Sequence, residues 1–277
     1  MRERTNALGT YLRARRELVT PHQAGIPTMG ARRVPGLRRE EVAMLAGISV
    51  DYYLRLERGR DRNPSLQVLE AIARVLQLDD EHRAHLRSLV AQIPRGPRQW
   101  ARDEPPPAGA LTLLHSLPQP AFIENRFFDI VASNGLARAV SPRLTDGGNQ
   151  LRDVFLDPAE RALHPDWEGV TECLVASLRH TVGNAIDDPH LGEFVGELLR
   201  WSPRFRQLWA RHDVRGQRGA TLRLDHPQVG EMTLHRERLA ISGTEGMELV
   251  VLHAAPGSVA ADRLALLGAA VLVPSAA

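Results

Sequence analysis

Residues 49 to 55 hold a hydroxyl, a carboxylate, a guanidinium and a branched apolar side chain on the outward side of a short predicted helix. At such positions an arginine can take a guanine edge through two hydrogen bonds, an aspartate can accept from cytosine, and a valine can meet a thymine methyl group. We therefore predict that Ser49, Val50, Asp51 and Arg55 contact base edges. Because an aspartate also repels phosphate, Asp51 would penalise a misplaced helix.

A second set of polar side chains surrounds this stretch and suits phosphate, whose contacts fix register on DNA without reading its sequence. The predicted phosphate contacts are Arg38, Arg39, Tyr52, Arg58, Arg60 and Arg62. The chain has no lysine; residues 1–100 hold 18 arginines against 11 carboxylates, and residues 101–277 hold 17 against 22. This split favours phosphate binding by the first part alone. A GC-rich genome would explain the missing lysine but not the split.

Two short helices joined by a tight turn must position these side chains. Within residues 36–59 the apolar side chains recur at spacings of three to five, as two crossed helices that share a small core require. These core positions are Val42, Leu45, Ile48, Tyr53 and Leu56. Gly47 permits the turn, and Ser49 stands where an N-cap opens the second helix. The alternative is a helical hairpin with a solvated charged face, but the turn and the cap together favour a DNA-reading helix-turn-helix.

The first 93 residues are predicted to form one all-helical domain of five helices. A first helix over residues 5–19 is followed by a long loop over residues 20–36, where Pro and Gly recur. Ser65 caps a fourth helix, and a fifth begins at Asp79. Residues 94–109 hold five prolines and two glycines, which is typical of a linker.

Residues 110–277 are predicted to form an α+β domain with a small antiparallel sheet. The expected strands are residues 121–124, 127–131, 220–225, 231–236 and 247–254. The expected helices start at Asn134 and cover residues 168–183 and 190–211. Turn residues at 226–230 and 242–246 separate the last three strands.

Ordered motifs along nearly the whole chain resemble one family. Residues 8–90 resemble the repressor-like helix-turn-helix domain of the XRE family, and residues 32–43 are similar to its MmyB-like branch, common in actinomycetes. The likeness continues through residues 154–158, Asp166-Trp167, 187–189, 202–209, 212–215, 226–230 and 256–258. The resemblance implies a PAS-like second domain that binds a small molecule of lipid type, such as a fatty acid.

Aromatic and polar side chains of the second domain are compatible with such a ligand. The predicted pocket residues are Phe122, Phe127, Trp167, Arg179, Trp201, Phe205, Arg206, Trp209 and His212. An arginine among them can hold a carboxylate head group through two hydrogen bonds. Two alternatives stay open: the aromatic residues form an ordinary core, and the arginines form structural ion pairs with Asp153, Asp157 or Asp213.

Other classes of protein find little support. The sequence shows no HExxH motif, Gly-rich phosphate loop or GxSxG elbow, and its one cysteine, Cys173, has apolar neighbours. We expect a regulator without enzymatic activity, cofactor or metal, which binds a pseudo-palindromic operator as a homodimer. The longest apolar run, residues 264–273, is about half of a membrane span, so we expect a cytoplasmic, nucleoid-associated protein. In the alternative, the second domain is a dimerisation or protein-partner module without ligand.

Overall fold

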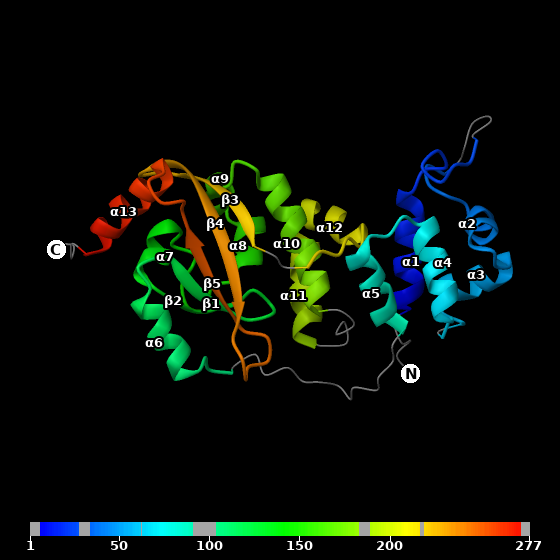
Figure 1. Ribbon diagram of the computed structural model, residues 1–277, viewed down its shortest axis with the longest axis horizontal. Helices are drawn as coiled ribbons and strands as arrows, with labels where there is room; N and C mark the ends of the chain where they lie inside the picture. Colours follow the sequence, from blue (N-terminus) through cyan, green and yellow to red (C-terminus); the bar gives the residue numbers. More distant parts are fainter. Residues whose placement is uncertain are drawn as a thin grey trace. The chain divides into compact units, whose positions relative to one another are not determined.

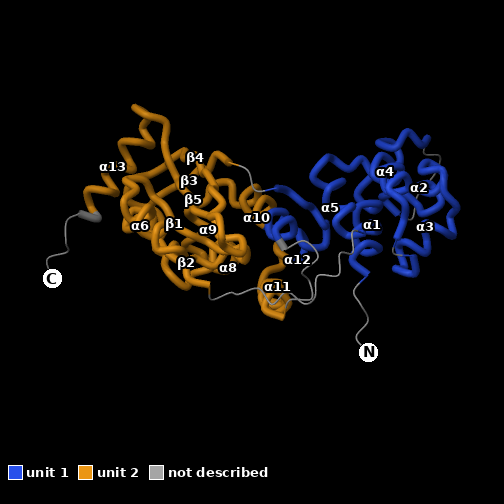
Figure 2. Tube along the Cα trace, turned by 60° about the horizontal axis from the view of Figure 1, so that its bottom comes forward, with its two compact units in different colours: residues 1–98, 175–187, 206–216 blue, residues 99–174, 188–205, 217–277 orange. Residues whose placement is uncertain are grey.

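The computed structural model of the chain describes residues 6–27, 34–61, 63–90, 104–182, 189–216 and 219–272. The chain forms two compact units, coloured blue and orange in Figure 2. Unit 1 comprises residues 1–98, 175–187 and 206–216; unit 2 comprises residues 99–174, 188–205 and 217–277. Unit 1 thus takes two segments from the second half of the chain. The domain boundaries expected at residues 93 and 110 stay a prediction.

The start of unit 1 is helical, as predicted. Its helices are α1 (Ala7–Leu18), α2 (Arg39–Ala46), α3 (Val50–Glu57), α4 (Leu66–Val75) and α5 (Asp80–Val90) (Figure 1). The side chains of Ser49 and Ser65 accept hydrogen bonds from backbone N–H groups in the first turns of α3 and α4, which confirms both predicted N-caps. The side chain of Asn6 caps α1 in the same way and was not predicted.

One apolar cluster holds the helices of unit 1 together. Its fully buried members include Tyr11, Leu12, Val42, Tyr53, Leu56 and Leu86, and it also contains Val214 from the second half of the chain. The prediction that Leu45 belongs to this core is wrong, because Leu45 is 41% exposed. Helix α2 buries Val42 and Ala43 instead, and Leu45 lies on its outer side next to the exposed Met44.

Unit 2 is built around an antiparallel sheet with the strand order β2-β1-β5-β4-β3, which confirms the predicted α+β class. The strands are β1 (Ala121–Glu124), β2 (Ile130–Ser133), β3 (Ala220–His226), β4 (Gly230–Ala240) and β5 (Glu248–His253). The helices are α6 (Ala108–Ser116), α7 (Gly135–Val140), α8 (Gln150–Leu156), α9 (Pro158–Leu163), α11 (Pro189–Trp201) and α13 (Val259–Leu272). Two more helices, α10 (Trp167–Val182) and α12 (Pro203–Ala210), begin in unit 2 and end in unit 1.

Both faces of the sheet are apolar, because successive side chains of a strand point to opposite faces. Phe122 of β1 packs in a cluster with Val140 of α7 and Leu264 of α13. Its neighbours Ala121 and Ile123 pack in a second cluster with Leu114 of α6. Helices therefore cover the sheet on both sides. None of the helices among the described residues is long and apolar enough to cross a membrane.

Two predicted elements of unit 2 are wrong in their extent. The expected strand 127–131 begins only at Ile130, because residues 125–128 form a turn in which the side chain of Asn125 accepts from the N–H groups of Phe127 and Asp129. The expected helix 190–211 is two helices. Pro203 starts a new helix, and the hydroxyl of Ser202 caps it by accepting from Phe205 N at 3.1 Å.

Four helices of unit 2 have no counterpart among the predicted elements. They are α6, whose first residues lie in the expected linker, α8, α9 and α13. Signals for two of them were present: the side chains of Asn149 and Asp157 cap α8 and α9, and Pro158 occupies the first position of α9.

Candidate functional site

The turn between α2 and α3 has the geometry of a helix-turn-helix, in which α3 would be the reading helix, the helix that contacts DNA bases. Gly47 adopts the left-handed conformation, with φ of 67°, which glycine tolerates without steric cost. The N–H of Ile48 then donates to the carbonyl of Ala43 at 3.0 Å, and the side-chain oxygen of Ser49 lies 3.1 Å from the N atom of Tyr52. The chain therefore closes α2 and opens α3 within three residues, as predicted.

The four predicted base-reading residues all lie on the outer side of this motif. Ser49, Val50, Asp51 and Arg55 are exposed. The guanidinium carbon of Arg55 lies 5.4 Å from the centre of the Tyr52 ring, within the range of a cation–π contact. The opposite side of α3 buries Tyr53 and Leu56, as predicted. Contact between the exposed residues and bases stays a prediction.

A buried carboxylate fixes the far end of α3. Glu57 accepts one hydrogen bond from Nε of Arg16 and one from Nε of Arg39, each at 2.6 Å. Its backbone carbonyl accepts from the side chain of Asn6 at 2.7 Å. Burying a carboxylate is costly unless it is paired in this way. Three elements, α1, α2 and α3, therefore meet at Glu57, which was not among the predicted site residues.

The predicted phosphate contacts have unequal surroundings. Arg38, Arg58 and Arg60 are exposed, Tyr52 is half-buried, and Arg62 lies outside the described residues. Arg39 keeps 46% of its side-chain surface although it is paired with Glu57, and this hydrogen bond raises the pKa of Arg39. Arg39 is therefore a structural residue of the motif whether or not it also meets phosphate.

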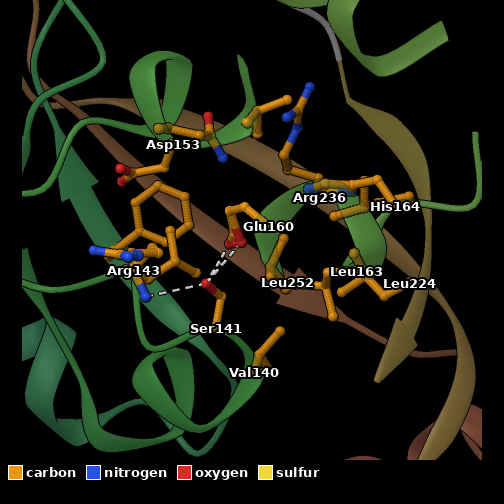
Figure 3. A pocket seen from close by; sticks show the side chains of 15 residues that line it. Val140, Ser141, Arg143, Asp153, Glu160, Leu163, His164, Leu224, Arg236 and Leu252 are labelled. Carbon is orange, nitrogen blue, oxygen red and sulfur yellow. Dashed lines mark hydrogen bonds between the residues drawn. The ribbon is translucent and has the colours of Figure 1, made fainter. Parts of the chain in front are cut away.

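A cavity of about 30 Å³ lies in unit 2 between the sheet and the helices α7, α8 and α9 (Figure 3). Eight apolar side chains line it. They are Phe122, Val140, Leu144, Val154, Leu163, Leu222, Leu224 and Leu252. The polar side chains in its wall are Ser141, Arg143, Gln150, Asp153, Glu160, His164 and Arg236. A volume of this size holds a water molecule.

The polar wall of the cavity contains buried atoms whose hydrogen-bonding capacity is unused. Nε of Arg236, Nδ1 of His164, Oε1 of Gln150 and Oδ2 of Asp153 have no hydrogen-bond partner among the described residues. Glu160 differs, because it accepts from the hydroxyl of Ser141. Unpaired buried polar atoms are rare in folded proteins and call for an explanation such as a bound molecule.

Burial dominates the electrostatics of this wall. It raises the pKa of Glu160 and of Asp153, so both carboxyl groups hold their protons more tightly than usual. It also lowers the pKa of His164 to about 4, with a further contribution from the charge of Arg236. Burial lowers the pKa of Arg236 as well, and the nearby charge of Arg238 adds to this effect. The cavity therefore contains a desolvated positive charge.

Few of the predicted ligand residues in unit 2 face this cavity. Phe122 lines it. Trp167 lines an open groove next to it, where the guanidinium carbon of Arg161 lies 4.1 Å from a Trp167 ring centre. Phe127 and Phe205 are buried, and Trp201 is 66% exposed. His164, which was not among the predicted ligand residues, lines both the cavity and the groove.

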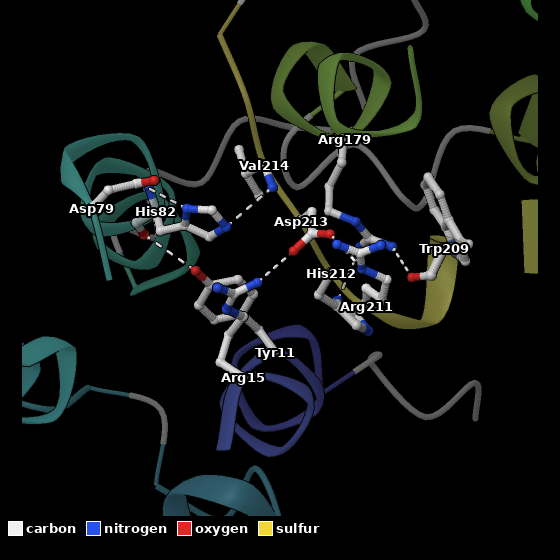
Figure 4. A network of polar contacts seen from close by, with 10 residues as sticks. All are labelled: Tyr11, Arg15, Asp79, His82, Arg179, Trp209, Arg211, His212, Asp213 and Val214. Atoms are coloured by element: carbon white, nitrogen blue, oxygen red, sulfur yellow. Dashed lines mark hydrogen bonds and ion pairs between the residues drawn. The ribbon is translucent and has the colours of Figure 1, made fainter. Parts of the chain in front are cut away.

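The other predicted ligand residues belong to unit 1. The buried guanidinium of Arg179 donates to the carbonyl of Trp209 at 2.7 Å and lies 3.1 Å from Nδ1 of His212 (Figure 4). Asp213, one of the three carboxylates proposed as a structural partner, pairs with Arg15 at 2.6 Å and Arg211 at 2.8 Å. Arg206 is exposed. A ligand role for these residues stays a prediction.

Both halves of the chain match known families. Residues 7–86 match the helix-turn-helix domain, and residues 106–267 match the family described as the MmyB-like transcription regulator ligand binding domain. Neither description is that of an enzyme. No curated protein matches the chain. The first match covers the helices that carry the exposed residues of α3, and the second covers the whole cavity of unit 2.

Proposed function

The chain belongs to the MmyB-like transcription regulators, which join a DNA-binding helix-turn-helix to a ligand-binding domain, and from this premise we propose that its ligand is an apolar molecule with one carboxylate, such as a fatty acid. The ligand lies in the cavity of unit 2, with its carboxylate on Arg236. The single observation that carries the proposal is the unpartnered Nε of Arg236 in the wall of a cavity that eight apolar side chains also line.

The charge on Arg236 supports an anionic ligand. A buried guanidinium is stabilised by a carboxylate that it can hold through two hydrogen bonds. The Cys173 side chain hydrogen-bonds to the guanidinium of Arg236, and the charge of Glu124 acts on it, but Nε has no partner among the described residues. The carboxylates in the cavity wall do not fill this place: Glu160 is bound to Ser141, and Oδ2 of Asp153 is unpaired. The unpartnered Nδ1 of His164 adds a second polar atom beside Arg236.

The size of the cavity implies that the ligand enlarges it. Pockets for small ligands usually have about 300–1,000 Å³, far more than the present 30 Å³. Helices α8 and α9 and the residue that follows them, His164, must therefore shift away from the sheet. A ligand that binds only the enlarged form shifts the protein towards it, which is what a sensor requires.

A thermal-shift experiment with paired probes tests the ligand class. We expect sodium laurate to raise the melting temperature of the full chain more than 1-dodecanol, which has the same chain length without the charge. Arg236→Gln should respond equally to both probes, whereas Arg236→Lys keeps some preference for laurate. The matched control is Arg223→Gln, which changes an exposed arginine on the neighbouring strand β3. Equal shifts with the two probes on the wild type, or an unchanged preference in Arg236→Gln, would contradict the proposal.

For DNA binding we propose that Ser49, Val50, Asp51 and Arg55 read base edges, and that two copies of the chain bind a pseudo-palindromic operator as a homodimer. The exposure of all four residues on α3 supports this assignment. If no fatty acid shifts the melting temperature and the chain is dimeric by light scattering, the second domain is instead a dimerisation module.

A further inference from the structure

The region that matches the ligand-binding family contributes directly to the unit that reads DNA. Of the matched residues 106–267, the segments 175–187 and 206–216 belong to unit 1. Val214 is 2% exposed and is part of the same apolar cluster as Tyr11 and Leu86. Residues 206–216, the inserted segment, therefore contribute Val214 to the apolar core that also buries Tyr53 and Leu56 of α3.

Polar contacts hold the inserted segment to α1 and α5. The carboxylate of Asp213 lies 2.6 Å from Nη1 of Arg15 in α1. The N–H of Val214 donates to Nε2 of His82 at 3.3 Å, and the N–H of Gly216 donates to Glu81 at 2.9 Å. Figure 4 shows Arg15 and His82 reaching the segment from two helices. The segment is thus anchored on both sides of Val214.

The neighbouring residue of α1 contacts the reading helix. Arg16 is buried and donates through Nε to Glu57, the last residue of α3, at 2.6 Å. Close packing reinforces this contact, because a Cβ atom on Gly9 of α1 would lie only 2.1 Å from the carbonyl oxygen of Glu57. Helix α1 and the end of α3 therefore cannot move independently without breaking buried contacts.

We propose that α1 couples the inserted segment to the reading helix, with Arg15 and Arg16 as the positioning residues. Adjacent residues of a helix point in different directions, so this pair contacts Asp213 on one side and Glu57 on the other. When the segment moves, α1 moves with it and carries the end of α3. Displacement of residues 206–216 is thereby converted into a change in DNA affinity. The inference rests on DNA binding by the family and not on the nature of the ligand.

Charge-neutralising variants separate this coupling from simple electrostatics. Asp213→Asn removes a negative charge and Arg15→Gln a positive one, so a purely electrostatic effect on DNA binding would have opposite signs in the two variants. We expect both to weaken binding by about fivefold, which is the lower end of typical coupling between sites. The probe is the duplex that the wild-type chain selects from a random-sequence library. Binding is measured by fluorescence anisotropy well below each melting temperature.

A control and a rescue complete the DNA experiment. Arg13→Gln also removes a positive charge from α1, but Arg13 pairs only with Glu17 on the exposed side among the described contacts, so its affinity should stay near that of the wild type. The rescue is the conservative variant Arg15→Lys, which keeps a positive charge facing Asp213 and leaves the pair of Asp213 with Arg211 intact. It should bind DNA within about twofold of the wild type. Opposite effects of the two single variants, or equal effects of Arg15→Gln and Arg13→Gln, would overturn the proposal.

A second measurement needs no DNA. Hydrogen exchange at the amides of α3 should be faster in Asp213→Asn than in the wild type, although Asp213 does not contact α3, because α1 no longer holds its end in place. Faster exchange confined to residues 206–216 and α5 would show that the segment is merely docked and would overturn the coupling.

Discussion

Arg16 and Glu57 form a buried ion pair in which Nε of the arginine lies 2.6 Å from the carboxylate, and the two side chains keep only 8% and 3% of their surfaces. Removing one partner of such a pair leaves the other charge buried and unpaired, which costs about 3–5 kcal/mol. We predict a loss of this size in the free energy of unfolding of Glu57→Ala, measured by urea denaturation. Glu40→Ala is the control, because Glu40 pairs with Arg38 at the surface and should change stability by less than about 1 kcal/mol. Equal losses in the two variants would show that the buried pair is not special.

Two helical glycines provide a matched test of the packing between α1 and α3. A methyl group on Gly9 would collide with the carbonyl of Glu57, whereas one on Gly109 in α6 would meet open space. Gly109→Ala should therefore stabilise the protein by about 0.5–1 kcal/mol, the usual gain for a helical glycine. Gly9→Ala should lower the melting temperature and weaken DNA binding. If both substitutions raise the melting temperature, α1 and α3 are not in close contact in solution.

Base reading and phosphate binding should respond differently to mutation. Arg55→Ala is expected to cost about 1–3 kcal/mol of binding and to relax specificity at one base position, whereas Arg60→Ala should weaken all sequences alike and lower the salt slope by about one. Arg60 is the better phosphate variant, because Arg39→Ala would also disturb Glu57. Selection from a random library followed by anisotropy at several salt concentrations distinguishes the two outcomes. Indistinguishable variants would contradict the assignment of separate roles.

Acid should destabilise unit 1 through two histidines. Burial lowers the pKa of His85 to about 4 and that of His212 to about 3, with Arg179 as a further cause in both cases. In the unfolded chain both return to about 6.5. Between pH 6.5 and about 4 the unfolded chain therefore binds protons that the folded chain does not, so the free energy of unfolding falls as the pH falls.

The measurement is the melting temperature from pH 7.5 to pH 4.5. His212→Gln should flatten the acid side of this profile, and His22→Gln, which changes an exposed histidine of unit 1, should leave its shape unchanged. A wild-type profile that is flat down to pH 4.5, or one that His212→Gln does not alter, would contradict the burial of uncharged histidines in this cluster.

The helix-turn-helix was predictable because its signals are local. A glycine at 47, serine caps at 49 and 65, and apolar side chains at helical spacing act within a few residues, and the structure confirms each of these features. Local spacing fails to predict the exposure of Leu45. Its spacing fits the core, but the packing of α2 against α4 and α3 leaves it on the outer side.

The polar wall of the cavity was not predictable in the same way. Arg236 is one of many arginines and lies in a strand whose first residues alternate between buried and exposed side chains. No neighbouring residue in the sequence therefore indicates that its Nε is buried and unpaired. His164 and Gln150 line the same cavity, although both lie more than 70 residues before Arg236 in the sequence. Aromatic side chains were more conspicuous, but most of those predicted to bind ligand occupy cores or the surface. The packing of segments far apart in the sequence determines which side chains line the cavity, and local sequence patterns do not indicate that packing.

The path of the chain limits how such regulators can be recombined. The polypeptide passes between the two compact units five times. Arg179 reaches unit 1 after two of these passages, and Asp213 and Val214 reach it after four. A chimera that joins a foreign helix-turn-helix at residues 94–109 would therefore inherit an inserted segment shaped for another partner, with Val214 and Asp213 facing mismatched surfaces. An exchange of DNA-binding domains between such proteins, in evolution or in protein engineering, therefore requires residues 175–187 and 206–216 to be exchanged as well.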